Sequence, residues 1–131
     1  MSAKPLIFVV EDDPANQLLF RAVLEGAGYE VEVASTAAEA RERLAAVSPA
    51  LILMDVQLPG EDGLSLTRWL KFMHETSSIP VVALTASTRA RDREAAMAAG
   101  CIGFISKPID VGTFPSRVAD FLDSPRGETS R

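Results

Sequence analysis

Residues 51–63 read LILMDVQLPGEDG, an apolar run that leads into a carboxylate and then into a Pro-Gly pair. The run does not alternate polar with apolar residues, which is typical of a strand buried on both faces of a sheet. Asp55 ends the run, and Pro59-Gly60 predicts a sharp turn just beyond it. A carboxylate at the end of a strand is a helix cap, a ligand or a nucleophile, and the remaining sequence has to distinguish these.

Composition predicts one globular domain with one hydrophobic core. The chain has 131 residues, of which 47% are hydrophobic and 24% charged. Its net charge of −5 argues against nucleic acid as a direct partner, because phosphate backbones are bound by basic surfaces. One cysteine, Cys101, excludes an internal disulfide framework and suits a reducing compartment. No apolar stretch reaches the roughly 18 residues that cross a bilayer, so we expect a cytoplasmic domain without membrane contact.

Short apolar runs alternate with helical patterns five times along the chain. Such alternation predicts the α/β class, with a parallel sheet covered by helices on both faces. The folded unit is expected over residues 1–123, and the polar segment 124–131 is expected to be a flexible tail. Strands are predicted at Leu6–Val10, Glu30–Ala34, Ala50–Met54, Pro80–Leu84 and Gly103–Ser106, and helices near 14–27, 37–47, 63–74, 89–99 and 111–123.

The predicted helices carry start and stop signals. Asp13 precedes Pro14, a pair typical of an N-cap followed by the first helical turn. Thr36 is followed three residues later by Glu39, which reads as a capping box. The expected N-caps are Asp13, Thr36 and Asp62, and the glycines expected to end the first and fourth helices are Gly28 and Gly100.

Helical spacing in the first helix predicts a core-facing stripe. Phe20 and Leu24 lie off that stripe, either as ordinary packing or as part of a docking patch for a kinase or phosphotransfer helix. The residues expected in the stripe are Leu18, Leu19, Ala22 and Val23.

Four other residues with reactive, aromatic or charged side chains are expected to have structural or solvent-exposed roles rather than functional ones. Cys101 is expected to be a small core residue, Trp69 to pack on the flank of the third helix, and Glu61 to be solvated. His74 is the one histidine, and it lies at a predicted helix end without a phosphotransfer context, so a phosphohistidine role is set aside.

Acidic residues and a lysine follow the predicted strands at their carboxyl ends. In open α/β sheets, ligands bind beyond these ends. Glu11 and Asp12 follow the first strand, Asp55 the third, Thr85 the fourth and Lys107 the fifth. If the first, third, fourth and fifth strands are neighbours, these residues converge. Clustered carboxylates repel unless a cation intervenes, and a hard, oxygen-rich set of this kind suits Mg²⁺.

Such a cluster matches a phosphoryl-accepting aspartate. Asp55 would be the nucleophile, with a divalent cation beside it. Lys107 would neutralise charge on the transferring phosphoryl oxygens, and Thr85 would donate a hydrogen bond to one of them.

The chain resembles the receiver domain of bacterial two-component response regulators. The resemblance covers about residues 5–123 and rests on four motifs in order, VVEDDP, LILMDVQLPGEDG, ALTAS and FISKPI. It implies a flavodoxin-like (βα)5 fold with strand order 2-1-3-4-5.

The resemblance also implies a set of site residues. Asp55 corresponds to the phosphorylated aspartate. Asp12 corresponds to the direct ligand of Mg²⁺ (or Mn²⁺), Glu11 acts largely through water, and the backbone carbonyl of Gln57 is a further ligand. Gln57 and Ser87 lie at the two positions that tune water attack on the phosphoaspartate.

Switching in this family links the phosphoryl-contacting pair, here Thr85 and Lys107, to an aromatic residue on the fifth strand. That residue is Phe104, where many relatives carry Tyr. The Lys107-Pro108 bond is expected to be cis. Phosphorylation is then expected to alter the face formed by the fourth helix, fifth strand and fifth helix, which includes the stretch from Arg89 to Arg93.

We therefore expect a stand-alone switch that accepts a phosphoryl group from a histidine kinase or histidine phosphotransfer protein. It would be a monomer or a phosphorylation-dependent dimer, would assist only its own phosphorylation and dephosphorylation, and would act by protein contact. One alternative is a Mg²⁺-dependent aspartyl-phosphate phosphatase or phosphotransferase. Haloacid-dehalogenase-like enzymes, however, need an aspartate where Gln57 stands. The others are a phosphorylation-incompetent scaffold and a receiver portion of a longer protein.

Overall fold

Within the described part of the chain, five parallel strands and five helices alternate in a three-layer α/β fold. The structure, a computed structural model, describes residues 4–123, so the expected tail at 124–131 lies outside the described residues. No helix within residues 4–123 is long and apolar enough to span a membrane. The elements are β1 (Leu6–Val10), α1 (Pro14–Gly26), β2 (Glu30–Ala34), α2 (Ala37–Leu44), β3 (Leu51–Asp55), α3 (Gly63–Phe72), β4 (Val81–Thr85), α4 (Ala90–Ala99), β5 (Gly103–Ser106) and α5 (Phe114–Asp123).

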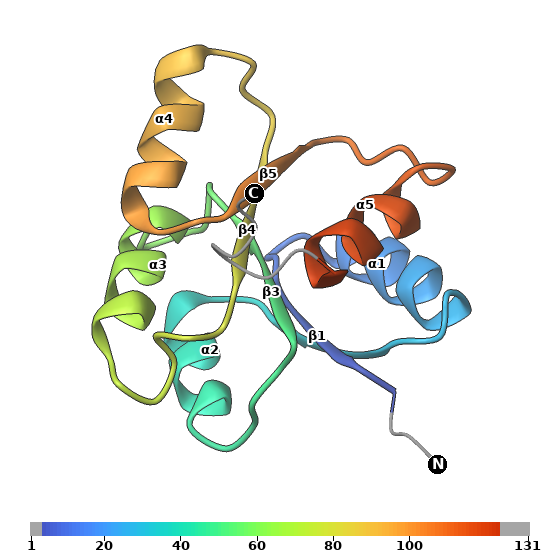
Figure 1. Cartoon of the computed structure of the whole chain (residues 1–131), viewed down its shortest axis with the longest axis horizontal. Helices are drawn as coiled ribbons and strands as arrows, with labels where there is room; N and C mark the ends of the chain where they lie inside the picture. Colours follow the sequence, from blue (N-terminus) through green and yellow to red (C-terminus); the bar gives the residue numbers. More distant parts are fainter. Residues whose placement is uncertain (1–3, 124–131) are drawn as a thin grey trace.

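The strand order is β2-β1-β3-β4-β5, which confirms the expected fold. Helices α1 and α5 cover one face of the sheet, and α2, α3 and α4 cover the other (Figure 1). The register aligns the carboxyl ends of neighbouring strands, with Val10 beside Met54 and Thr85 beside Ser106. The residues that follow these strands are therefore brought to one edge of the sheet.

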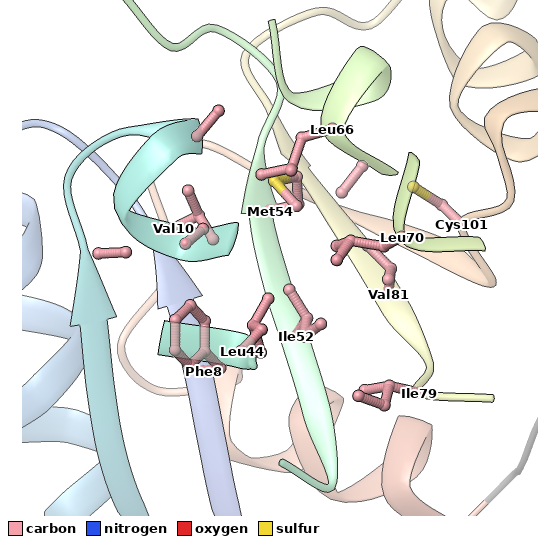
Figure 2. Close-up of a cluster of buried hydrophobic side chains, with 14 of the residues drawn as sticks. Phe8, Val10, Leu44, Ile52, Met54, Leu66, Leu70, Ile79, Val81 and Cys101 are labelled. Carbon is pink, nitrogen blue, oxygen red and sulfur yellow. The ribbon is translucent and has the colours of Figure 1, made fainter. Parts of the chain in front are cut away.

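Two apolar clusters, one on each face, hold the helices to the sheet. Successive strand residues alternate between them, so that Ile7 and Val9 face α1 and α5 while Phe8 and Val10 face α2 and α3. Figure 2 shows the second cluster, in which Phe8 and other strand side chains meet those of α2 and α3. Both faces of the sheet are buried, which explains why strands such as β1 and β3 carry continuous apolar runs rather than apolar residues at alternate positions.

Two strands run one residue further than the apolar runs predicted. β3 spans Leu51–Asp55 rather than Ala50–Met54, and β4 spans Val81–Thr85 rather than Pro80–Leu84. The parallel ladder continues through Asp55, which lies beside Leu84, because pairing depends on the backbone and not on side-chain polarity. Asp55 and Thr85 are thus strand residues, with the rigidity that this gives.

The predicted inner face of α1 is wrong for Leu18, Leu19 and Ala22, which are exposed, whereas Val23 packs against the core. Phe20 and Leu24 are buried, with exposed fractions of 2% and 0%, whereas Leu18 is 70% exposed. Leu18 lies about 200° around the helix from Phe20, so the two cannot share a face. Phe20 packs against Phe114 of α5 with ring centroids 5.6 Å apart, and this contact orients the helix. A docking patch built on Phe20 and Leu24 is therefore excluded.

Helix caps match their signals, although several helix ends differ from the prediction. Asp13, Thr36 and Asp62 each accept a hydrogen bond from the backbone three residues on. Gly100 is in the left-handed conformation after α4, with φ of 116°. α1 stops at Gly26, before Gly28, and α5 begins at Phe114 because Asp110 and its neighbours form a turn first.

Gly63 allows the start of α3 to lie directly against the end of β3. A Cβ atom on Gly63 would be 2.0 Å from the carbonyl oxygen of Asp55. We expect Gly63→Ala to lower the free energy of unfolding by about 2–3 kcal/mol, because β3 is central and the backbone there cannot move freely. Urea denaturation measures this.

Gly26→Ala is the matched control, because Gly26 ends α1 and a Cβ atom added there would have no other atom within 4 Å. It should leave stability unchanged or raise it by up to about 1 kcal/mol. Equal denaturation midpoints for the two variants would contradict the packing described here.

Candidate functional site

Asp55 lies at the centre of the carboxyl edge of the sheet. Its side chain is almost fully buried, and strands pair on both sides of β3. One carboxylate oxygen, Oδ1, accepts a hydrogen bond from the backbone N–H of Gln57 at 3.0 Å. The other, Oδ2, accepts one from Nζ of Lys107 at 2.9 Å. The carboxylate is thus fixed in position and orientation.

Glu11 follows β1 and is 1% exposed, so it is a buried acid with defined partners. Its Oε1 accepts a hydrogen bond from Nζ of Lys107 at 3.1 Å. Its Oε2 accepts one from the backbone N–H of Asp13 at 3.1 Å and one from Nδ2 of Asn16 at 3.4 Å. The start of α1 therefore holds Glu11 beside Asp55.

Lys107 supplies the positive charge between these two carboxylates. Burial by itself lowers the pKa of the Lys107 ammonium, but hydrogen bonds and charge attraction from Asp55 and Glu11 outweigh burial and raise that pKa above its usual value. The backbone N–H of Lys107 donates to the carbonyl of Thr85 at 2.9 Å, and the Lys107-Pro108 peptide bond is cis. Lys107 is therefore held at the site as a cation.

Glu11, Asp12 and Asp55 form an acidic cluster with one carboxylate oxygen from each within 4.8 Å of the others. Asp12 is exposed, so the cluster opens to solvent on its side. Three carboxylates and one ammonium leave excess negative charge, and the donors are hard oxygen atoms. Such a donor set fits Mg²⁺ better than a softer transition metal.

A cavity of about 200 Å³ lies over Asp55, between β3, β4 and α4. Thr85 lines it, and its hydroxyl oxygen accepts a hydrogen bond from the backbone N–H of Ser87 at 3.0 Å. The hydroxyl hydrogen of Thr85 remains able to donate to another group. The other lining residues are Val56, Gln57, Leu64, Leu84, Ala86, Ser87, Asp92, Ala95, Ala96 and Lys107.

Phe104 lies on β5 next to Ala83 of β4, and its side chain is half-buried. The guanidinium of Arg93, on α4, is 4.4 Å from the centre of the Phe104 ring. Arg117 of α5 donates a hydrogen bond to the carbonyl of Phe104 at 3.0 Å. Arginines from two helices thus contact the position expected to report on the site.

Several contacts at the site were not predicted. Gln17 donates to the carbonyl of Glu11 at 2.6 Å and to the hydroxyl of Ser35 at 3.0 Å, which joins α1 to the end of β1. Glu61 is not merely solvated, because Arg41 of α2 binds it with two hydrogen bonds of 2.7 Å. That bond to Arg41 lowers the pKa of Glu61. No spacing rule pairs these residues.

The remaining candidates lie away from the cavity. His74 is exposed in the turn after α3. Trp69 is half-buried on α3, as expected, with the Arg41 guanidinium 4.8 Å from its ring centre. Cys101 is 4% exposed, and burial raises the pKa of its thiol to about 11.

Comparison with known proteins shows that the chain is similar to response regulators. The family described as the response regulator receiver domain matches residues 7–119. The chain is 40% identical over 116 residues to the polar-differentiation response regulator DivK of Brucella ovis, covering 88% of this chain and 94% of that protein. It is also similar to a solved response regulator from Chloroflexus aurantiacus described as putative, with 30% identity, a TM-score of 0.87, and coverage of 92% and 99%.

A third similar structure bears on the acidic cluster. It is the receiver domain of a sensor histidine kinase from Pseudomonas aeruginosa, with a magnesium ion coordinated in its active-site cleft. The identity is 31% and the TM-score 0.84, and the match covers 93% of this chain and all of that one.

Charge repulsion within the acidic cluster should be measurable as lost stability. We expect Asp12→Asn to raise the free energy of unfolding by about 0.5–1 kcal/mol in the presence of EDTA, because it removes one of three clustered negative charges. Added Mg²⁺ should then stabilise the variant less than the wild type. Urea denaturation with and without Mg²⁺ checks both effects.

Asp13→Asn is the control, since it makes the same charge change one residue away and keeps a side chain that caps α1. A similar stabilisation in both variants would mean that net charge, rather than the cluster, is responsible.

Cys101 should be unreactive while the protein is folded. A raised pKa keeps the thiol protonated to higher pH, so at pH 8 the native protein holds almost no thiolate there. We expect iodoacetamide to modify native Cys101 about 100-fold more slowly than the urea-unfolded chain, as followed by intact mass. Comparable rates in the two states would show that the thiol is accessible and ionised.

Proposed function

This chain belongs to the response regulator receiver domains of two-component signalling, and on that premise we propose that it accepts a phosphoryl group on Asp55 with Mg²⁺ bound. The observation that carries the proposal is the pair of hydrogen bonds that fixes the buried Asp55 carboxylate at the floor of an open cavity. Thr85 and Lys107 line the same cavity. A nucleophile, a cation and a hydroxyl are thus presented to one incoming group.

The proposed step transfers a phosphoryl group from a phosphohistidine. An oxygen of the Asp55 carboxylate attacks phosphorus and forms a new O–P bond while the P–N bond breaks. The electron pair of the broken bond stays on the imidazole nitrogen, which takes a proton from solvent. Lys107 stabilises the phosphoryl oxygens electrostatically, and the Thr85 hydroxyl donates a hydrogen bond to one of them.

The metal would be held by Asp12, Asp55 and the Gln57 carbonyl, with Glu11 acting through water. When bound, Mg²⁺ (or Mn²⁺) would supply positive charge for the phosphoryl oxygens. The close spacing of three carboxylate oxygens supports this assignment. Glu11 also keeps Lys107 in place, because it binds the same ammonium as Asp55.

A hollow beside the site suits a donor protein. It lies between α1 and the segment after β5, and its lining includes Leu19, Pro108 and Ile109 as well as Lys107, with the buried Phe20 ring beneath. Leu18, on the same helix, is 70% exposed. An apolar surface next to Lys107 fits a histidine kinase or histidine phosphotransfer protein that presents its phosphohistidine to Asp55.

The output would be protein contact at the face of α4, β5 and α5, where Phe104 and its arginine contacts lie. Gln57 and Ser87 would tune hydrolysis of the phosphoaspartate. In that step water attacks phosphorus, the bond between phosphorus and the Asp55 oxygen breaks, and inorganic phosphate and the free Asp55 carboxylate are released. A phosphatase of the haloacid-dehalogenase type is disfavoured because Gln57 cannot act as the second acid. Cytoplasmic location and a phosphorylation-dependent dimer remain predictions.

Incubation with acetyl phosphate tests the acceptor. We expect the wild type to gain one phosphoryl group, seen by intact mass, when Mg²⁺ is present and not with EDTA. Acetate leaves with the electron pair of the broken O–P bond. Asp55→Asn should gain none, because the amide is not a nucleophile under these conditions.

Asp62→Asn is the matched control, since Asp62 is exposed, caps α3 and keeps that capping ability as Asn. It should be phosphorylated like the wild type. Phosphorylation that persists in Asp55→Asn would disprove the assigned acceptor. A folded wild type that gains no phosphoryl group from acetyl phosphate or from a phosphorylated histidine phosphotransfer protein would favour the scaffold interpretation.

A further inference from the structure

We propose that Asp92, in the first turn of α4, is a positioning residue for the phosphoryl site. It holds Thr85 in the resting arrangement through Ser87, while the adjacent Arg93 holds Phe104. This inference rests on the proposed function, since it concerns what must move when Asp55 carries a phosphoryl group.

A chain of hydrogen bonds runs from Thr85 to α4. The Ser87 backbone N–H donates to the Thr85 hydroxyl oxygen at 3.0 Å. The Ser87 hydroxyl donates in turn to Oδ2 of Asp92, and its oxygen accepts from the backbone N–H of Arg89 at 3.1 Å. Asp92 itself lines the cavity over Asp55. The loop that follows Thr85 is therefore attached to α4 through the side chain of Ser87.

This chain determines what Ser87 can do. Its hydroxyl hydrogen is used by a carboxylate, and hydrogen bonds to charged acceptors are stronger than neutral ones. While this bond persists, Ser87 is not free to donate to a phosphoryl oxygen or to an attacking water. If Thr85 is to turn toward a phosphoryl group, its bond to Ser87 has to lengthen or the loop has to move with it.

The next residue on α4, Arg93, has one favourable and one unfavourable feature. The Arg93 guanidinium lies 4.4 Å from the Phe104 ring centre, a favourable cation–π distance. Its Nε atom is nevertheless buried without a hydrogen-bond partner. Burial of an unpaired donor is unfavourable and offsets part of the ring contact. Arg93 can therefore leave the ring at small cost, because Nε regains water when it does.

Asp92 and Arg93 are neighbours in one helical turn, so the two contacts are mechanically linked. Movement of Thr85 toward the cavity acts on Ser87 and Asp92, and a shift of that turn also moves Arg93 away from Phe104. The first turn of α4 would thus connect the phosphoryl site to the output face. A simpler interpretation is that Asp92 only stabilises the start of α4, where acids are favourable.

Binding of beryllium trifluoride, a phosphoryl analogue, separates these interpretations. In this reaction an Asp55 oxygen replaces a water ligand on beryllium. If the contacts favour the resting arrangement, removing either should raise the apparent affinity, because more molecules are already competent to bind. We expect Asp92→Ala and Ser87→Ala each to tighten binding about threefold to tenfold, measured by calorimetry with saturating Mg²⁺.

Ser87→Ala is the decisive variant, since it removes the link and leaves the charge of Asp92 in the cavity. The double variant should bind no more tightly than the better single one, because both changes break the same chain. Glu94→Ala and Arg91→Ala are matched controls on exposed positions of α4. They should stay within about twofold of the wild type.

The connection between the first turn of α4 and Phe104 is tested separately, by NMR. In Arg93→Ala and Asp92→Ala without beryllium, the NMR signals of the Phe104 ring should shift toward those of the beryllium-bound wild type. A role confined to the start of α4 would lower the urea midpoint of Asp92→Ala without this directed shift. If Asp92→Ala folds poorly, the same measurements on Ser87→Ala test the inference instead.

Three results would overturn the inference. Ser87→Ala could bind like the controls, Asp92→Ala could act additively with it through charge alone, or the Phe104 signals could stay unchanged in Arg93→Ala and Asp92→Ala. A wild type that takes up neither beryllium trifluoride nor a phosphoryl group would instead refute the proposed function, and this inference with it.

Discussion

The ammonium of Lys107 lies between the buried carboxylates of Asp55 and Glu11, and the site depends on this arrangement. Without it, two acids with less than 5% exposure would face each other with no compensating charge. Even with it, Asp12 adds a third negative charge nearby. Negative charge at the site therefore exceeds positive charge, a pattern that fits a divalent cation and that we expect to be unfavourable for the fold when no cation is bound.

The sheet makes this arrangement possible because it fixes the backbone at each contributing residue. Val10 pairs with Met54, and Thr85 pairs with Ser106, so Glu11 emerges beside Asp55 and Lys107 beside Thr85. Apolar clusters on both faces resist any shift of register, because a one-residue slip would exchange the two faces of a strand. The cost of holding like charges together is therefore met by the hydrophobic core.

Sequence reasoning predicted the fold correctly and named residues that the structure brings to one edge of the sheet, because both depend on strand ends. Buried parallel strands have recognisable apolar runs, and their carboxyl ends meet at one edge. The sequence predictions were wrong where the outcome depends on contacts between elements far apart in the chain. The inward face of α1 depends on Phe20 meeting Phe114, and the Arg41–Glu61 pair joins residues from α2 and the loop before α3. Such contacts depend on packing angles that spacing rules do not contain.

The contacts of Phe104 show how a missing hydroxyl changes the way a switch can work. A tyrosine at this position could exchange hydrogen bonds, whereas Phe104 offers only the faces and edges of its ring. Arg93 lies over that ring, and its own Nε is left as a buried, unpaired donor that weakens the contact. Because these two effects oppose each other, the proposed mechanism would need only a small change at Thr85 to alter the contact between Arg93 and Phe104. A stronger contact to Phe104 would favour one arrangement and oppose a switch, so under the proposed mechanism the unpaired Nε of Arg93 would help to keep the ring responsive.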